Sequence, residues 1–472
     1  MAQITFLGAI EGVTGSMYLI ETRESKVLLD CGLFQGRKVE EEANLQPLPF
    51  DISAIDAVVL SHAHLDHSGR TPLLVKQGYS GPIFMTRPTC DLIEVLLKDA
   101  ASLQERDVFW ENKRRKRAGK KEIEPLYTMA DVEEVLGLCI GVGYYQKINI
   151  ADGIGVRFSD AGHILGSSIV EIFVEEGGKE KKLVFSGDLG NSEAALLRDP
   201  DAIKSADILL MESTYGDRDH RSMEDTLVEF EGILQEAFEN GGNILIPSFA
   251  LGRTQELIFR LGELYQQGKI KHRAIFLDSP MAIAVTEIYH RYQNVYSDED
   301  KEVIQNSSKN IPLHKQSLHT LLPILRYSTT TEESMELNKI EGGAIIIAGS
   351  GMCNGGRIRH HLKHNLWRKQ SHVIIVGFQA AGTPGRALVD GAKKYKIAGE
   401  EISVRAKIHT LGGFSAHASK TQLLDWLSNF EGKKPPLYLI HGEAKAKESL
   451  LKSVQQQGWS ASIPELGQVI TF

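Results

Sequence analysis

Four metal-binding side chains fall within six residues directly after a short apolar run, and this cluster constrains the fold more than any other feature of the sequence. The apolar run ends at Leu60, and the segment SHAHLDHSG that follows contains His62, His64, Asp66 and His67. His62 and His64 project to the same side of an extended loop, and the next two ligands follow where the chain can turn. Imidazole nitrogen and carboxylate oxygen are ligands that zinc prefers. Imidazoles buried together without a metal would leave polar atoms unpaired, so we expect a metal centre here.

One such cluster cannot complete two tetrahedral sites, so further ligands must come from distant parts of the chain. Asp188 follows a predicted strand in KLVFSGDLG, and His441 follows another in PLYLIHGE. His163 lies in a glycine-flanked loop, FSDAGHILGSS. Functional residues of layered α/β folds gather beyond the carboxyl ends of strands. His163 and Asp188 taken alone would be ordinary residues, and the cluster is what makes them candidate ligands.

Apolar runs alternate with segments of helical periodicity, which is the pattern of a layered α/β fold. The predicted strands cover residues 57–60, 182–185, 208–211, 243–246, 344–347, 373–376 and 437–440. The predicted helices cover residues 91–106, 223–239 and 254–267. A length of 472 residues favours two domains, because single cores stop growing well below that size.

The composition excludes several classes of protein. No stretch has the apolar length of a membrane span, and the N-terminal MAQITFLGAIEG, with Glu11 and no basic leader, predicts a first strand rather than a signal peptide. Four scattered cysteines without a Cys-x-x-Cys pair argue against a disulfide framework and suit the cytoplasm. A net charge of −8 excludes a general polyanion binder, but not a local cationic cleft with bound metals.

One short segment is strongly basic, with seven Lys or Arg residues among residues 113–121. Such a block has the charge to contact a phosphate backbone. Charge blocks are more often solvated, so we expect a surface turn between two helices.

The motifs SHAHLDHSG, AGHILG and SGDLG together resemble the metallo-β-lactamase superfamily, whose α/β fold is an αβ/βα sandwich with two metals at one edge. The resemblance implies that the first zinc binds His62, His64 and His163. It implies that the second binds Asp66, His67 and one further residue, and that Asp188 bridges both. Asp30, in VLLDCG, matches the first acidic motif, which implies that it orients a ligand by hydrogen bonding.

Three later motifs resemble the β-CASP branch of nucleic-acid-processing nucleases, and the resemblance covers essentially the whole chain. MESTYGDR with Glu212, GGFSAHAS with His417 and LIHGEA with His441 are similar to its motifs A, B and C. Histidine at motif C resembles the RNA-processing members, since DNA-processing members typically have valine there, and His441 would complete the second zinc site. The chain looks most like compact prokaryotic relatives of the polyadenylation endonuclease. The implied domains are residues 1–208 and 405–472 of the metallo-β-lactamase sandwich and an inserted α/β β-CASP domain, residues 209–404.

Three strand-to-helix junctions in the predicted insertion have the chemistry to bind phosphate. Exposed N–H groups and the helix dipole favour anions there, and arginine adds bidentate contacts. The candidate residues, junction by junction, are Ser248 and Arg253, Ser350 and Gly351, and Thr383 and Arg386. Such junctions are common in α/β domains. Three of them facing a metal site predict a phosphate-lined cleft, which resembles the family's nucleic-acid channel.

The resemblance implies a ribonuclease with two Zn²⁺ per chain, in which a hydroxide held by both metals attacks an RNA phosphodiester. Asp66 would be both a ligand and a proton acceptor, and His417 the general acid that protonates the leaving oxygen, or at least a donor to the scissile phosphate. Glu212 would orient His417. The implied products carry a 3′-hydroxyl and a 5′-phosphate. RNA is the expected partner and a membrane is not, while a homodimer is left open.

Three rival functions remain as alternatives: a small-molecule hydrolase of thioesters or lactams, a DNA nuclease, and a non-catalytic RNA-binding scaffold. The inserted domain and the motifs around Glu212 and His417 count against the first, and His441 counts against the second. Structural zinc sites are closed, whereas this ligand set leaves room for water, which counts against the third. The sequence leaves open which RNA is cut and whether cleavage is endo- or exonucleolytic.

Overall fold

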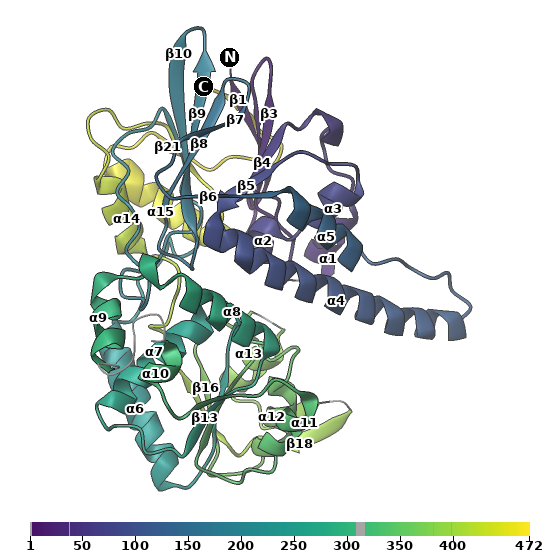
Figure 1. Cartoon of the computed structure of the whole chain (residues 1–472), viewed down its shortest axis with the longest axis vertical. Helices are drawn as coiled ribbons and strands as arrows, with labels where there is room; N and C mark the ends of the chain where they lie inside the picture. Colours follow the sequence, from purple (N-terminus) through teal and green to yellow (C-terminus); the bar gives the residue numbers. More distant parts are fainter. Residues whose placement is uncertain (1, 37, 308–316, 381, 398) are drawn as a thin grey trace. The chain divides into compact units, whose positions relative to one another are not determined.

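The computed structural model describes residues 2–36, 38–307, 317–380, 382–397 and 399–472, and the chain divides into two compact units (Figure 1). Unit 1 comprises Met1–Ser192, Asp199–Asp219 and His417–Phe472. Unit 2 comprises Glu193–Arg198 and His220–Ala416. The chain therefore builds most of unit 1, forms unit 2, and returns to unit 1 for its last segment.

Unit 1 contains two seven-stranded sheets. The first, in the order β22-β1-β2-β3-β4-β5-β6, consists of β1 (Gln3–Gly8), β2 (Met17–Glu21), β3 (Lys26–Leu29), β4 (Ala57–Val59), β5 (Ile83–Thr86), β6 (Cys139–Val142) and β22 (Val469–Thr471). The second, in the order β21-β20-β11-β10-β9-β8-β7, consists of β7 (Ile148–Ala151), β8 (Ile154–Asp160), β9 (Ser168–Glu176), β10 (Lys179–Phe185), β11 (Ile208–Met211), β20 (Leu437–Leu439) and β21 (Ala461–Ser462).

The main core lies between the two sheets. Alternate residues of β1, Ile4 and Phe6, are buried in one cluster with Val170 and Ile172 of β9. The opposite face of the second sheet is covered by α14 (Lys420–Ser428) and α15 (Ala444–Gln456), since residues of both helices share a second buried cluster with that sheet.

The helices α4 (Arg87–Arg117) and α5 (Met129–Leu138) pack together, and α4 contacts β5 and β6 (Figure 1). The short helices α1 (Lys38–Glu42), α2 (Leu65–Ser68) and α3 (Thr71–Lys76) complete the unit. The predicted αβ/βα sandwich is confirmed.

Strand direction brings several loops to one edge of the sandwich. β3 and β4 are parallel neighbours in the first sheet. β10, β11 and β20 are parallel neighbours in the second. Because the carboxyl ends of parallel strands meet at one edge, residues that follow these strands lie close together.

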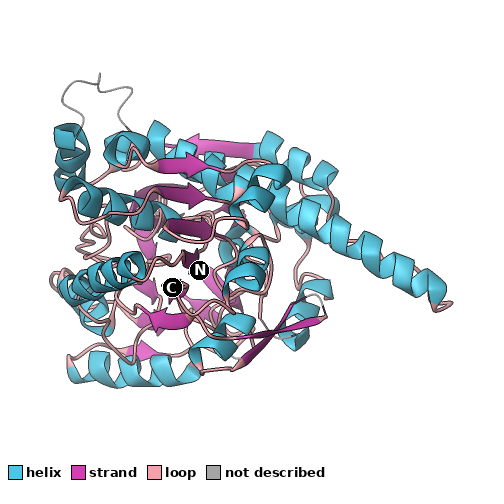
Figure 2. Cartoon of the chain, turned by 90° about the horizontal axis from the view of Figure 1, so that it is seen from below, coloured by secondary structure: helices cyan, strands magenta, loops and turns pink. Residues whose placement is uncertain are grey.

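Unit 2 has its own six-stranded, all-parallel sheet in the order β14-β13-β15-β12-β16-β19. Its strands are β12 (Ile244–Pro247), β13 (Ala274–Leu277), β14 (Leu325–Tyr327), β15 (Ala344–Ala348), β16 (His372–Ile375) and β19 (Lys407–Thr410), beside a small pair, β17 (Lys394–Ile397) and β18 (Glu400–Ser403). Its helices are α6 (Met223–Glu239), α7 (Arg253–Gln266), α8 (Pro280–Arg291), α9 (Asp298–Ser307), α10 (Leu318–Leu321), α11 (Thr331–Leu337), α12 (Ile358–Asn365) and α13 (Pro384–Val389). Figure 2 shows the strands and helices of the chain by type.

A buried carboxylate ties several elements of unit 2 together. Asp278, which follows β13, accepts hydrogen bonds from Ser334 Oγ at 2.6 Å and Arg357 Nη1 at 2.7 Å. His361 Nε2 lies 2.6 Å from the same carboxylate. Burial would raise the pKa of Asp278, but these hydrogen bonds outweigh it and lower the pKa to about 2. The carboxylate is therefore ionised and links β13 to α11 and α12.

The seven predicted strands coincide with strands to within a residue or a few, and the predicted helices 223–239 and 254–267 coincide with α6 and α7. The prediction for residues 91–106 was too short, because α4 runs from Arg87 to Arg117. Of the basic residues 113–121, residues 113–117 therefore belong to the end of this helix, whereas residues 118–121 lie in the exposed segment between α4 and α5, where a surface turn was predicted. Among the described residues, no helix is long and apolar enough to cross a membrane.

Candidate metal centre

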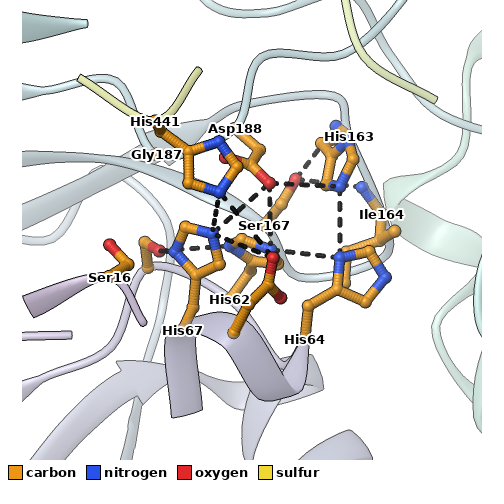
Figure 3. A network of polar contacts seen from close by, with 12 residues as sticks. Ser16, His62, His64, His67, His163, Ile164, Ser167, Gly187, Asp188 and His441 are labelled. Carbon is orange, nitrogen blue, oxygen red and sulfur yellow. Dashed lines mark hydrogen bonds and ion pairs between the residues drawn. The ribbon is translucent and has the colours of Figure 1, made fainter. Parts of the chain in front are cut away.

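The seven predicted ligands come from four segments of unit 1 and converge on one place, and Figure 3 labels all of them except Asp66. They divide into two groups, and the ligand atoms within each group lie within 4.8 Å of one another. The groups are His62, His64, His163 and Asp188, and Asp66, His67 and His441. Each segment follows a strand: β4, β8, β10 or β20, with Asp66 and His67 on helix α2.

The first group has the spacing of ligands around one metal ion. His62 Nε2 lies 3.2 Å from His64 Nδ1, which in turn lies 3.3 Å from His163 Nε2. Two nitrogens bound to one tetrahedral zinc at its usual bond length would be about 3.3 Å apart. The three imidazoles therefore fit a single metal ion.

The second group has similar spacing on the other side of Asp188. His67 Nε2 lies 3.2 Å from His441 Nε2, and His441 Nε2 lies 3.7 Å from Asp66 Oδ2. Asp188 Oδ2 lies 3.4 Å from His67 Nε2 and 3.5 Å from His62 Nε2. One carboxylate thus faces both groups, as a bridging ligand would.

Burial supports a metal in this place. His62 and His67 are fully buried, and Asp188 is only 2% exposed. Asp188 Oδ1 is buried without a hydrogen bond among the described residues. His441 Nδ1 lies 3.4 Å from this oxygen, and a bound cation would compensate further for the hydration that the carboxylate has lost. The donor set of imidazoles and carboxylates therefore fits a metal cofactor.

Asp30, at the end of β3, holds one ligand from behind. Its Oδ2 lies 2.7 Å from His67 Nδ1, and the carboxylate also accepts from the amide and hydroxyl of Ser61 at 2.8 and 2.9 Å. An imidazole that donates through Nδ1 keeps its Nε2 lone pair for a metal. Asp30 therefore fixes both the ring orientation and the tautomer of His67.

Two hydroxyl groups near the ligands could not be assigned from the sequence. Thr214 Oγ1 lies 3.2 Å from His441 Nδ1, in the position that Asp30 occupies behind His67. Ser61 sits between Asp30 and the ring of His62, with its Oγ 3.1 Å from His62 Nδ1. Their only sequence signal is adjacency to a motif, since Ser61 precedes His62 and Thr214 follows Glu212 by two residues.

The charges of the site suit a cation. Burial lowers the pKa of His62 and of His64, so both are neutral and able to ligate. Burial opposes ionisation of Asp66, but His67 outweighs it and the pKa falls to about 2. The pKa of Asp188 is also well below its usual value, because neighbouring imidazoles outweigh its burial. Burial would lower the pKa of His67, but Asp188, Asp30 and Asp66 outweigh it and raise that pKa well above its usual value. Two carboxylates therefore carry negative charge beside the neutral imidazoles of His62 and His64.

Glu212 and His417 form a separate pair beside the ligands. His417, which bridges to Gly190 just before α14, has Nδ1 3.3 Å from Glu212 Oε1. Glu212 is fully buried and accepts a hydrogen bond from Leu189 N at 2.6 Å. The His417 side chain is 22% exposed, and its ring centroid is 4.4 Å from that of His163. Burial would lower the pKa of His417, but Glu212 and then Asp188 raise it to about 9. The imidazole is therefore a protonated donor next to the ligand cluster.

The predicted phosphate-binding residues all lie in unit 2, and several are already engaged. Ser248 is buried and accepts a hydrogen bond from Thr254 at 3.0 Å, and Arg253 pairs with Glu256 at 2.7 Å. The side chains of three other predicted residues form hydrogen bonds or ion pairs with residues close by in the sequence. Ser350 Oγ donates to Asn354 at 2.7 Å, Thr383 caps α13, and Arg386 pairs with Asp390 at 2.9 Å.

Gly351, which follows β15 in the sheet of unit 2, lies close to the aromatic ring of Phe249, which follows β12. A side-chain carbon placed on Gly351 would lie 2.7 Å from the ring of Phe249, so any larger residue there would have to displace that ring. Phe249 is 45% exposed and Phe378 is 55% exposed. These aromatic side chains, which the sequence did not single out, lie beside loops that were predicted to bind phosphate.

Three family models match the chain. The metallo-beta-lactamase superfamily model matches residues 10–233, the Beta-Casp domain model residues 254–388, and the Zn-dependent metallo-hydrolase RNA specificity domain model residues 401–464. The matched regions follow one another along the chain and span both units.

Curated relatives align over nearly the whole chain. Ribonuclease TTHA0252 of Thermus thermophilus is 39% identical, with 99% of each chain covered. The transcription termination factor FttA of Thermococcus kodakarensis is 31% identical over 96% of this chain and 69% of its own, and that of Methanocaldococcus jannaschii is 30% identical over 93% and 67%. A crystal structure of a protein of unknown function from Enterococcus faecalis V583 has the same fold, with a TM-score of 0.55 at 16% identity and 99% of both chains covered.

Proposed function

This chain belongs to the β-CASP branch of the metallo-β-lactamase superfamily, and from that premise we propose that it is a zinc-dependent ribonuclease that hydrolyses RNA phosphodiester bonds. The observation that carries the proposal is the arrangement at the edge of unit 1. Asp188 of the first group of metal ligands also faces His67 of the second group, and a protonated imidazole, His417, lies next to both groups without belonging to either. Hydrolysis of a phosphodiester needs these two components, one for attack and one for departure.

The residues divide the reaction between them. Metal ions bound to the seven ligands would supply an acidic water as the nucleophile and positive charge for the attacked phosphate. Asp66, which is ionised and 21% exposed, accepts the proton that this water gives up. His417 donates a proton to the leaving ribose oxygen through its partly exposed edge. Glu212 keeps His417 protonated and oriented. The products then carry a 3′-hydroxyl and a 5′-phosphate.

RNA is the proposed substrate for two reasons. One relative over the full length of the chain is a ribonuclease, and the model matching residues 401–464 is described as an RNA specificity domain. His441 lies within that matched segment and belongs to the second ligand group. We also propose that the candidate residues of unit 2 bind phosphate. Of the two arginines among them, Arg386 is the more accessible, since its side chain is 46% exposed and that of Arg253 is 9% exposed.

Two zinc ions per chain are the proposed cofactor, and elemental analysis tests the number. The wild-type protein should hold close to two transition-metal ions per chain. Changing His62 and His64 together to Ala removes two of the four atoms of the first group, so at least one site should empty. Full metal content in that variant would refute the ligand assignment.

End-labelled RNA and DNA of the same sequence, incubated with and without a chelator, test the activity itself. We expect cleavage of RNA that the chelator abolishes. Faster cleavage of DNA would make the protein a DNA nuclease. Hydrolysis of thioesters or lactams without cleavage of either nucleic acid would make it a small-molecule hydrolase, and RNA binding without any hydrolysis would make it a scaffold.

We place this ribonuclease in the cytoplasm. Cys31, Cys90, Cys139 and Cys353 are free thiols, as in a reducing compartment. A homodimer is the alternative to a monomer, and sedimentation velocity of the metal-loaded protein decides between them.

A further inference from the structure

The C-terminal half of α4 extends away from the sheet that its N-terminal half covers (Figure 1, Figure 2). The buried residues of this helix end at Ala101, and no residue from 102 to 126 is buried. Residues 118–126 return beside the helix, because the Asn112 side chain donates to Ile123 O at 2.8 Å and accepts from Ile123 N at 2.9 Å. We call residues 102–126 the arm. The arm has a defined conformation held by these hydrogen bonds, yet it contributes no buried residue to the core of unit 1.

Two adjacent aromatic rings are exposed on the arm. Phe109 is 54% exposed and Trp110 is 53% exposed. Their ring centroids are 5.5 Å apart, and the Lys113 ammonium lies 4.2 Å from the centroid of one and 4.5 Å from that of the other. Exposing two large rings to water is costly unless a ligand covers them.

The tip of the arm concentrates positive charge on an acidic protein. Residues 113–121 hold seven Lys or Arg and no Asp or Glu, although the whole chain carries a net charge of −8. The helix dipole favours a few cations in the last turn. It does not account for like charges one turn apart, such as Lys113 and Arg117, which repel each other. Neither solvation nor the dipole explains why aromatic rings accompany the charges.

We propose that the arm binds single-stranded RNA, with Phe109 and Trp110 stacking on bases and the basic tip contacting phosphates. The inference rests on the proposed ribonuclease function, for which the arm would be an additional site that holds the substrate strand. Exposed aromatic rings beside cations are the combination that binds single strands without reading their sequence. Duplex RNA fits less well, because its bases are already stacked. The centre of a protein interface is depleted of charge, whereas the tip of the arm is nearly all charge.

The test compares two arm variants with the wild-type enzyme, all as metal-loaded full chains. One variant is Phe109→Ala with Trp110→Ala. The other is Lys116→Gln, Arg117→Gln and Lys120→Gln, and all five side chains are exposed, so folding should be preserved. A matched control, Arg23→Gln, Lys179→Gln and Lys433→Gln, removes the same charge from exposed positions elsewhere in unit 1. Cleavage is measured on a hexamer, on a single strand several times longer, and on bis-p-nitrophenyl phosphate.

For the long strand, the aromatic variant should raise KM by at least about fivefold, as expected from losing one stacked base. The charge variant should lower the salt dependence of that KM by about 2 in log–log slope. Both variants should keep the wild-type kcat and cleave the hexamer and bis-p-nitrophenyl phosphate normally, since the arm is proposed to hold only the additional length of a long strand. The control should match the wild type throughout.

An unchanged KM for the long strand in both variants would overturn the inference, as would equal competition by duplex and single-stranded RNA. Altered self-association of the aromatic variant with unchanged KM would assign the arm to a protein contact and overturn it too. Failure of the wild type to cleave any RNA would refute the proposed function instead. Fluorescence anisotropy of the labelled long strand on the same variants then tests the arm independently.

Discussion

Replacing His417 by Ala separates proton donation from metal binding. Its pKa of about 9 means that about 99% of the imidazole is protonated at neutral pH, so the residue is ready to act as an acid. Removing a general acid costs on the order of 10²–10⁴ in rate, or about 3–5 kcal/mol of transition-state stabilisation. We therefore expect RNA cleavage by His417→Ala to fall by that factor. Metal content should stay at the wild-type level, because His417 belongs to neither ligand group.

The leaving group decides the interpretation. A ribose oxygen departs poorly without a proton, whereas p-nitrophenolate departs readily, so hydrolysis of bis-p-nitrophenyl phosphate should lose much less activity. The pH profile adds a second measurement. The acid form of His417 is the active one, so wild-type activity should fall as pH rises through its pKa. That fall should lie at or below about 9, since bound cations disfavour the proton, and it should vanish in the variant.

His360→Ala is the matched control, since His360 is an exposed histidine of α12 in unit 2. It should cleave both substrates at the wild-type rate. Equal losses on RNA and on bis-p-nitrophenyl phosphate would refute proton donation and make His417 a donor that positions the phosphate. Loss of a metal ion from His417→Ala would show that it is a ligand.

Three further perturbations follow from buried contacts. Asp30→Asn exchanges an acceptor for a donor opposite His67 Nδ1, so metal affinity should fall by about 10–100-fold in a chelator competition. Unchanged affinity would refute the role of Asp30 in orienting His67. His441→Ala should empty the second site before the first and suppress RNA cleavage, and an unchanged metal stoichiometry and rate would make His441 a bystander. Asp278→Asn should lower the unfolding free energy of unit 2 by about 2 kcal/mol at neutral pH. The pKa of Asp278 is depressed in the folded state, so this contribution to stability is present above about pH 4 and is lost as the pH falls toward about 2. Denaturant unfolding of the variant and the wild type at both pH values measures the contribution. Identical unfolding curves for the two proteins would refute a stabilising role of the Asp278 carboxylate.

The metal ligands could be predicted because each lies in a short motif at a strand end. An apolar run followed by His62 and His64 determines both the local strand and the position of its ligands. Parallel pairing of β10, β11 and β20 then brings the ends of strands that are distant in the sequence close together. The sequence alone does not predict this pairing, which could be inferred only from the family resemblance.

Other features left no such signal. The extension of α4 beyond residue 106 was missed because an unpacked helix has no buried stripe to produce apolar periodicity, although its Arg, Lys and Glu residues favour helix. Thr214 could not be assigned, since a hydroxyl behind an imidazole depends on where two loops meet. The side chain of Ser248 has the chemistry to bind phosphate, but only the packed loop reveals its contact with Thr254.

The order in which the ligands occur along the chain has a consequence for synthesis. Residues 62–188 supply six of the seven ligands, whereas His441 and the neighbouring His417 come only after all of unit 2. β20, which carries His441 to the site, pairs with β11 and cannot do so until the ribosome has made it. At ordinary rates of about 5–20 residues per second, the intervening stretch delays completion of the centre by about ten seconds to a minute. A nascent chain therefore lacks one ligand and the proposed general acid until its last segment has been made, and a fragment that ends before residue 417 lacks both.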